Sequence, residues 1–368
     1  MFNLFKKKKE ENNKGDQYIS LKVREVVKET PDTVTIFFEQ PEPYLEYKAG
    51  QYLTVIFDIN GKEERRSYSL CTSPFVDSYP GITVKRVKDG VVSNYLNDHI
   101  RPGKTIDIMK PLGNFTTDYH SKNKRNFVMI AGGSGITPIM GITKSVLVNE
   151  PESKVTLLYC SRSEEQIIFK TELEKLEANY GDRLMVIHNL SQPSGTWTGL
   201  KGRLDASKIK DVLDSTVDVK AEGNKFFVCG PEGLMDVSLE TLKGLGIPDE
   251  SVLEESFYND LEAKEKELKA EGKLSPELTR EIEVTVEGEV FVFEVPAGKT
   301  ILEAGLDEDV DMPYSCQSGL CTACRGRLLS GKVDMIEDAG LSQSEIDEGY
   351  ILCCSSKPAS SDIKIVIE

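Results

Sequence analysis

The sequence feature that most constrains this chain is a cysteine-rich segment near its C-terminus, PYSCQSGLCTACRG at 313–326. Cys316, Cys321 and Cys324 follow the spacing C-x4-C-x2-C, and a fourth cysteine comes about 30 residues later, in the adjacent pair Cys353 and Cys354. This order is the spacing of plant-type [2Fe–2S] proteins, in which four thiolates hold two irons. The loop is rich in small residues, so its backbone can wrap closely and aim N–H groups at the cluster sulfurs. We therefore predict a [2Fe–2S] site here.

Two other uses of the cysteines fit the sequence less well than a cluster. Structural zinc usually takes two short pairs of ligands, whereas here the fourth cysteine is remote and none of the three histidines is near the loop. A disulfide scaffold belongs to short secreted chains, and this chain has 368 residues. Five of the eight cysteines lie between 316 and 354, and such clustering favours metal ligation.

Charge and hydropathy limit the class of partner. The net charge is −16, which argues against nucleic acid, because phosphate binding needs a basic face. Residues 279–368 carry 18 acidic and 7 basic residues, a surface that would steer a basic partner or simply keep the protein soluble. The sequence contains no membrane-spanning segment and no secretory signal, so we expect a cytoplasmic protein without stable membrane insertion.

The pattern along the chain predicts three domains of mixed α+β and α/β class behind a disordered basic tail at 1–16. Residues 17–120 form short β-rich runs separated by Gly, Pro and Asp, which is typical of an antiparallel barrel. In 121–260, compact strands such as FVMIA and KFFVC alternate with helical patterns, including EEQIIFKTELEKLEANY, and this predicts a doubly wound parallel sheet. Residues 261–280 are highly charged and are typical of a linker, in part helical. A strand hairpin, the cysteine loop and a last strand fill 281–368.

Short motifs in the first two domains are typical of nucleotide binding. In RSYS, at 66–69, an Arg and a Tyr two residues apart on a strand share one face, where they can meet a diphosphate and a flat ring. In GVVS, at 90–93, we expect Ser93 to N-cap a helix whose start binds phosphate. GGSGITP, at 132–138, joins a strand to a helix and is either a pyrophosphate turn or a plain tight turn. CGPEGLM starts at Cys229, at a strand end where open α/β sheets bind ligands.

The order and spacing of these motifs, with ESF at 255–257 after them, resemble the ferredoxin–NADP reductase superfamily. With the cysteine loop at the C-terminus, the chain from about 17 to 368 resembles the reductase components of bacterial multicomponent oxygenases, most of all the phenylacetyl-CoA epoxidase group. The resemblance implies an FAD-binding barrel, an NAD(P)-binding domain and a C-terminal β-grasp ferredoxin domain. It also favours Cys354 as the fourth cluster ligand and leaves Cys353 as a bystander thiol or a substitute ligand.

The resemblance implies a set of FAD contacts. Arg66 would pair with the FAD pyrophosphate, Tyr68 would stack on the isoalloxazine, and Ser69 would hydrogen-bond near its N5. The remaining contacts would come from residues after RSYS and from the next strand and turn: Leu70, Lys85, Arg86, Val87, Gly90, Val91, Val92 and Ser93.

The resemblance also implies a nicotinamide site. Cys229 and Glu255 would flank the nicotinamide, and Phe257 would cover the flavin face that the nicotinamide must reach. Plant-type reductases carry Tyr at this last position, so the Phe keeps the stacking ring and lacks the hydroxyl. Ser69, Cys229 and Glu255 are the expected catalytic residues, through hydride-transfer geometry rather than acid–base chemistry. The dinucleotide would lie against residues of both glycine-containing motifs: Gly132, Gly133, Gly135, Thr137, Gly230 and Pro231.

The choice between NADPH and NADH is expected to depend on the segment YCSRSEEQ. Ser161 and Arg162 occupy the position at which NADPH-using relatives bind the 2′-phosphate. An Arg there favours NADPH, because a carboxylate would repel that phosphate. An ordinary exposed loop arginine is the alternative interpretation.

The function implied is electron transfer from NAD(P)H through FAD and a [2Fe–2S] cluster to another protein. FAD fits between the other two because it exchanges electrons in pairs or singly. The expected partner is a separate oxygenase that docks near the acidic ferredoxin domain. A fatty-acid desaturase or a free ferredoxin is the alternative acceptor. The alternative class is a non-catalytic module, either stabilised by zinc or flavin-binding and regulatory, and the complete set of cysteines together with RSYS and CGP argues against it.

Overall fold

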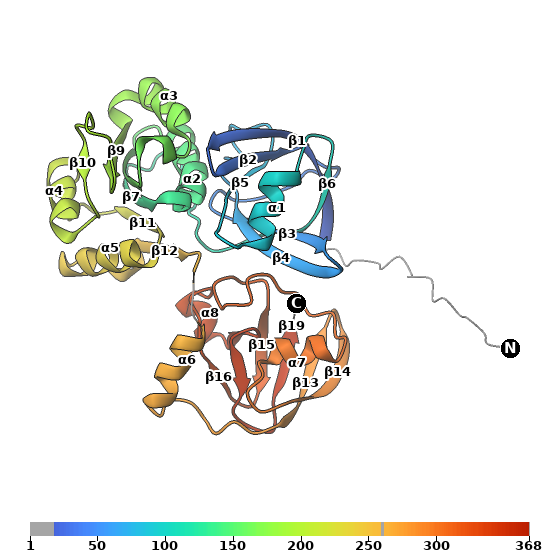
Figure 1. The fold of residues 1–368 in the computed structure, drawn as a ribbon. Helices are drawn as coiled ribbons and strands as arrows, with labels where there is room; N and C mark the ends of the chain where they lie inside the picture. The colour runs from blue at the N-terminus through green and yellow to red at the C-terminus, as the bar shows by residue number, and fades with distance from the viewer. Residues whose placement is uncertain (1–17, 259–260, 368) are drawn as a thin grey trace.

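The computed structural model describes residues 18–258 and 261–367, and three large sheets lie in successive parts of the chain (Figure 1). The tail expected at 1–16 lies outside the described residues. Within the described ranges, no helix is long and apolar enough to cross a membrane.

The first sheet is antiparallel, with six strands in the order β4-β3-β6-β1-β2-β5. A bridge between Leu70 and Ile82 joins its two outer strands and closes the sheet, which confirms the predicted barrel. Alternate residues of each strand, such as Leu21 and Val23, point into the barrel core, as the period of two requires. The elements are β1 (Tyr18–Thr30), β2 (Thr33–Phe38), β3 (Tyr52–Ile59), β4 (Lys62–Ser69), β5 (Gly81–Lys85), α1 (Val91–His99) and β6 (Thr105–Leu112).

The second sheet is parallel, in the order β10-β9-β8-β7-β11-β12, and helices cover both of its faces. Phe127 and Val128 are neighbours on β7 yet belong to two different cores, one on each face, which confirms the doubly wound prediction. The strand order reverses between β7 and β11, and ligands bind at such a switch point. The elements are β7 (Asn126–Gly132), α2 (Ile136–Asn149), β8 (Lys154–Ser161), α3 (Lys170–Tyr180), β9 (Leu184–Leu190), β10 (Leu200–Lys201), α4 (Ala206–Thr216), β11 (Lys225–Gly230), α5 (Glu232–Gly244) and β12 (Val252–Ser256).

One helix in this domain is shorter than its sequence predicts. The pattern EEQIIFKTELEKLEANY suggested a helix over 164–180, but α3 begins only at Lys170. Phe169 has a positive φ of 60°, which a continuous right-handed helix does not allow, and Ile167–Phe169 are buried in the core. Tertiary burial of this apolar turn therefore overrides the local helical pattern.

The third sheet has the order β14-β13-β19-β15-β17 and forms the C-terminal domain with a two-stranded sheet, β16-β18. Helix α7 begins with a capping box between Thr300 and Glu303, and α8 with one between Ser342 and Glu345. The elements are β13 (Arg280–Val286), β14 (Glu289–Val295), α7 (Ile301–Asp307), β15 (Arg325–Ser330), β16 (Val333–Met335), α8 (Gln343–Asp347), β17 (Tyr350–Leu352), β18 (Ser356–Pro358) and β19 (Lys364–Ile367).

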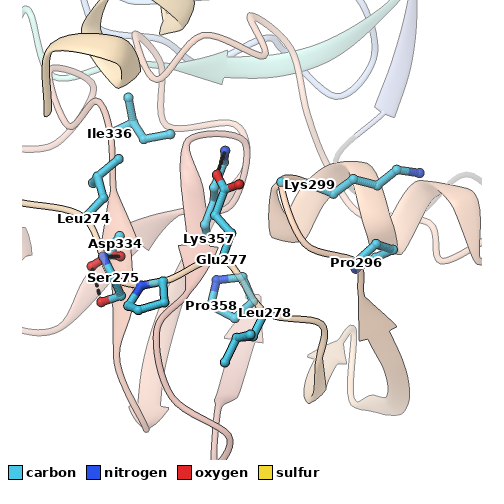
Figure 2. A pocket seen from close by; sticks show the side chains of 12 residues that line it. Leu274, Ser275, Glu277, Leu278, Pro296, Lys299, Asp334, Ile336, Lys357 and Pro358 are labelled. Atoms are coloured by element: carbon cyan, nitrogen blue, oxygen red, sulfur yellow. Dashed lines mark hydrogen bonds and ion pairs between the residues drawn. The ribbon is translucent and has the colours of Figure 1, made fainter. Parts of the chain in front are cut away.

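The segment expected as a linker is half helical and packs against the C-terminal domain. It contains α6 (Leu261–Ala270) and an extended stretch after it. The nearly buried ammonium of Lys357 lies 2.5 Å from a Glu265 carboxylate oxygen and 3.0 Å from one of Glu277, and Figure 2 shows the extended stretch beside Lys357. The Ser275 N–H donates to Asp334 at 2.6 Å. The cavity between these segments is about 10 Å³, room for about one water, so we place no ligand there.

Candidate active site

Three motifs that are far apart in the sequence line one cavity of about 260 Å³. Strand β4 contributes residues of RSYS, the end of β12 contributes ESF, and the third wall is the cysteine loop. The lining residues are Tyr52, Arg66, Ser67, Ser69, Glu255, Ser256, Phe257, Cys316, Ser318, Leu320 and Cys321. The cavity thus brings the predicted flavin, nicotinamide and cluster residues to one place.

On β4, Arg66 and Tyr68 lie in different surroundings. The Arg66 guanidinium pairs with Glu64 at 3.2 Å and donates to the Arg65 carbonyl at 2.6 Å. Its side chain is nevertheless exposed, so an anionic ligand can reach it. Tyr68 is half-buried against the barrel core and is not among the residues that line the cavity. Burial raises the pKa of Tyr68, so its hydroxyl stays protonated. Its stacking role stays a prediction.

The three expected catalytic residues, Ser69, Cys229 and Glu255, lie next to one another. The Ser69 hydroxyl donates to a carboxylate oxygen of Glu255 at 3.2 Å, and Glu255 is paired with Cys229 across strands β11 and β12. Loss of hydration raises the pKa of Glu255 to about 8, an effect that the Ser69 hydrogen bond partly opposes. Burial also raises the pKa of the fully buried Cys229 thiol. At neutral pH the set therefore contains a neutral carboxyl group, a neutral thiol and a hydroxyl, which suits positioning better than proton abstraction.

The glycine turn after β7 packs directly on the start of the CGP motif. A Cβ at Gly135 would lie 2.1 Å from the Cys229 carbonyl oxygen, and one at Gly132 would lie 2.6 Å from the Pro231 ring. Only glycine permits this approach. The turn leads into α2, in which Thr137 is buried at the second position. The two motifs therefore meet at the switch point of the sheet, where a pyrophosphate can approach backbone N–H groups.

The predicted N-cap at Ser93 is wrong. Helix α1 has Gly90 as its N-cap, and Ser93 is the third helical residue. Its hydroxyl instead accepts the Val87 N–H at 3.1 Å and fixes the preceding turn. Arg86, in the same turn, forms an ion pair with Asp98 of α1. Because the cap makes no side-chain hydrogen bond, the helix start is open to a phosphate.

Ser161 and Arg162 lie where β8 ends. Ser161 is buried, and its hydroxyl oxygen has almost no solvent-accessible surface. Arg162 is exposed, and its carbonyl accepts the N–H of Gln192 at 2.7 Å, which fixes the loop backbone while leaving the guanidinium in solvent. A ligand at this strand end would meet the exposed Arg162 side chain.

Sulfur atoms of the cysteine loop and of Cys354 contact one another. Cys316 is in hydrogen-bond contact with Cys321 and with Cys354, and Cys354 is in contact with Cys324. These contacts lower the pKa of Cys316 and raise those of Cys321 and Cys354, so the thiols share protons that a metal would displace. In the described part of the chain, no three His, Cys, Asp or Glu side chains are arranged around a single metal ion. The fit to a cluster rests on the four converging sulfurs and the loop around them.

The loop backbone is shaped for sulfur ligands, as its small residues predict. The Gly319 N–H donates to the Cys354 sulfur at 3.3 Å, and the Ser318 N–H donates to the Cys316 sulfur at 3.4 Å. Gly319 has a φ of +72°, and a Cβ there would lie 2.6 Å from the Glu337 side chain. Backbone N–H groups that point at the sulfurs would stabilise the negative charge of a bound cluster.

Adjacent cysteines of the 353–354 pair differ in their surroundings. The Cys353 side chain is fully buried, and its sulfur lies 3.5 Å from where a Cβ of Gly326 would be. The Cys354 sulfur accepts the Gly319 N–H and is in contact with Cys316 and Cys324. This difference supports Cys354 as the fourth ligand.

A contact between the barrel and the cysteine loop was missed by the sequence reasoning. The Tyr52 hydroxyl accepts the Thr322 N–H at 3.2 Å, and the hydroxyls of Ser67 and Ser315 are 2.6 Å apart. The Arg65 guanidinium lies 4.1 Å from the centre of the Tyr314 ring, a cation–π contact. Antiparallel alignment of QYLTVIFDI with KEERRSYS would have placed Tyr52 beside the RSYS motif, but nothing in the sequence indicates the loop as its partner.

Family models match all three parts of the chain. Residues 19–117 match the oxidoreductase FAD-binding domain, 129–239 match the oxidoreductase NAD-binding domain, and 284–359 match the 2Fe-2S iron-sulfur cluster binding domain. A component of the 1,2-phenylacetyl-CoA epoxidase of Escherichia coli is 33% identical over 94% of this chain and 96% of the relative. The chain belongs to the ferredoxin–NADP reductase superfamily, with a fused [2Fe–2S] domain. It is an oxidoreductase of this type and uses FAD, NAD(P)H and a [2Fe–2S] cluster.

Further relatives share this full-length organisation. The ferredoxin reductase component of the 3-ketosteroid-9-alpha-monooxygenase of Rhodococcus rhodochrous is 35% identical over 95% of this chain and 97% of the relative. Among solved structures, phthalate dioxygenase reductase aligns with a TM-score of 0.59 and 25% identity, over 96% of this chain and 98% of that one. The relatives named here belong to different oxygenases, so the shared part is the reductase and not the substrate that is finally oxidised.

Proposed function

We propose that this chain passes electrons from NADPH through FAD to the [2Fe–2S] cluster and on to a separate oxygenase. The shared cavity carries the proposal, since residues of the flavin strand, the nicotinamide strand and the cysteine loop line the same space. Bound FAD would take two electrons from NADPH and give them up one at a time. The protein positions the partners: Ser69 and Glu255 orient the reacting edge, and Phe257 stands over it.

We propose the following roles for residues of the site. The cluster ligands would be Cys316, Cys321, Cys324 and Cys354. Arg66 and the start of α1 would hold the phosphates of FAD, and the turn after β7 would hold those of the nucleotide. We propose the boundaries 17–120, 121–260 and 281–368 for the three domains, with 261–280 linking the second domain to the third. We also propose a cytoplasmic location.

The discrimination between NADPH and NADH provides the first test. Replacing Arg162 by Ala is expected to weaken NADPH binding about 10-fold to 100-fold, because it removes a charge-assisted hydrogen bond to the 2′-phosphate. NADH lacks that phosphate, so its reduction of the flavin should change less than about twofold. The measurement is the rate of flavin reduction against the concentration of each cofactor. Equal losses with NADPH and NADH would contradict the assignment.

The partner is proposed to be an oxygenase of the phenylacetyl-CoA epoxidase type. Support comes from the full-length similarity to a component of such an epoxidase and from an acidic groove beside the cysteine loop. Asp249, Glu254, Glu337 and Asp338 help line this groove, together with Leu320–Thr322 of the loop. Such a surface fits a basic docking face close to the cluster.

Reconstitution with a partner tests this proposal. The purified chain, NADPH and the oxygenase component of a phenylacetyl-CoA epoxidase should form product from phenylacetyl-CoA, and the rate at limiting partner should fall as salt rises. The oxygenase of a 3-ketosteroid monooxygenase and a fatty-acid desaturase serve as matched acceptors. Faster turnover with either of these would reject the epoxidase assignment while leaving the reductase activity intact.

A further inference from the structure

The barrel and the cysteine loop meet around one buried aromatic residue. Tyr52 is the first residue of β3, is 5% exposed, and packs with Cys321 and Ala323 of the loop in one apolar cluster. The same residue lines the cavity shared by the flavin and cluster motifs. Its ring is held firmly, since a Cβ at Gly113 would lie 3.0 Å from two ring carbons. Tyr52 is therefore a fixed contact from the flavin domain to a proposed cluster ligand.

The hydrogen bonds of the Tyr52 hydroxyl determine where its proton points. The Thr322 N–H donates to this oxygen at 3.2 Å, so the Tyr52 proton must go to another acceptor. The Thr322 hydroxyl lies 3.3 Å from this oxygen, and the Cys321 side chain packs in the same cluster as Tyr52, close enough to interact with its hydroxyl. A cysteine that ligates iron is a thiolate. Because a charged acceptor binds a proton donor more strongly than a neutral hydroxyl does, the sulfur is the favoured acceptor.

We propose that Tyr52 is a positioning residue for electron transfer, which donates a hydrogen bond from the flavin domain to the Cys321 sulfur of the cluster. This inference rests on the proposed function through the assignment of Cys321 as a ligand. Hydrogen bonds to cluster sulfurs set the reduction potential, since they stabilise the extra negative charge of the reduced state. The contact would therefore make the cluster a better electron acceptor when the two domains are docked.

The test compares Tyr52→Phe with two matched variants of the holoprotein. Tyr18→Phe removes a hydroxyl at the same interface, to which Arg65 donates, and Thr322→Val removes the competing acceptor. The readout is the reduction potential of the cluster, from redox titration followed by electron paramagnetic resonance. Tyr52→Phe should lower the equilibrium constant for cluster reduction about tenfold, equal to about 59 mV for one electron. Tyr18→Phe and Thr322→Val should leave it within about twofold of the wild type, about 18 mV by the same conversion.

Each failure has a distinct meaning. An unchanged cluster potential in Tyr52→Phe, with the cluster spectrum intact, would overturn the proposed hydrogen bond. A shift of equal size in Tyr18→Phe would also overturn it, because loss of domain docking would then explain the effect. If Cys321→Ser retains a normal cluster, the ligand assignment fails and the inference fails with it. Thermal unfolding of all variants identifies any that are simply unstable.

Discussion

Replacing Cys354 by Ser is expected to abolish the [2Fe–2S] cluster and to slow one-electron transfer to an acceptor by at least about 100-fold. Changes beside a metal site already cost 10-fold to 100-fold, and loss of a ligand should exceed them. Hydride transfer from NADPH to the flavin should continue, because Ser69, Cys229 and Glu255 lie on other elements. The measurements are the visible spectrum and the rates of flavin reduction and cytochrome c reduction under anaerobic conditions.

Cys353→Ser is the matched control, since it alters the adjacent residue. The sulfur of Cys354, and not that of Cys353, is in hydrogen-bond contact with the Gly319 N–H and with Cys316 and Cys324, so this variant should retain the cluster and electron transfer. It should lose some stability, because a buried thiol is replaced by a hydroxyl. If Cys353→Ser loses the cluster while Cys354→Ser keeps it, the fourth ligand has been assigned to the wrong cysteine.

Gly135→Ala is expected to slow the reduction of the flavin by NADPH roughly 100-fold, as misplacement of a reacting pair by about 1 Å can do. The added Cβ would lie 2.1 Å from the Cys229 carbonyl oxygen, so the turn and the CGP motif must separate. Stopped-flow reduction with NADPH measures the effect, and chemical reduction with dithionite bypasses the nucleotide. The dithionite reaction should be unchanged.

The matched control is Gly195→Ala, in an exposed loop of the same domain, where an added Cβ has no neighbour within 4 Å among the described residues. This variant should be indistinguishable from the wild type in reduction by NADPH. Normal reduction of Gly135→Ala would show that the turn tolerates displacement and does not position the nucleotide.

Spacing and periodicity were sufficient to predict the antiparallel barrel and the parallel sheet, whereas the β-grasp fold of the third domain was implied by the family resemblance. Apolar and polar residues alternate within β1, whereas β7 and β11 are continuous apolar runs, and this difference distinguishes an antiparallel barrel from a parallel sheet. Each pattern can be recognised within one short stretch of sequence. The cysteine loop was equally readable, since three of its four predicted ligands lie within nine residues. The glycine turn was identified as well. The structure alone shows why glycine is needed there, because the turn contacts the Cys229 carbonyl.

Features that depend on packing between distant segments could not be read from the sequence. Ser93 has the residue type of an N-cap, yet the chain begins the helix three residues earlier and uses the hydroxyl for the Val87 N–H. Phe169 continues a helical pattern but is buried in a left-handed turn. Tyr52 looks like an ordinary strand residue, and only the docking of the cysteine loop on β3 gives it a partner.

The central claim is that one chain carries electrons from NADPH through FAD to a [2Fe–2S] cluster. An anaerobic titration of the purified protein with NADPH, followed in the visible spectrum, tests it most directly. We expect the flavin and cluster bands both to bleach, with about three electrons taken up per chain. Bleaching of the flavin alone, with uptake of about two electrons, would contradict the claim, because the cluster would then be absent or disconnected from the flavin.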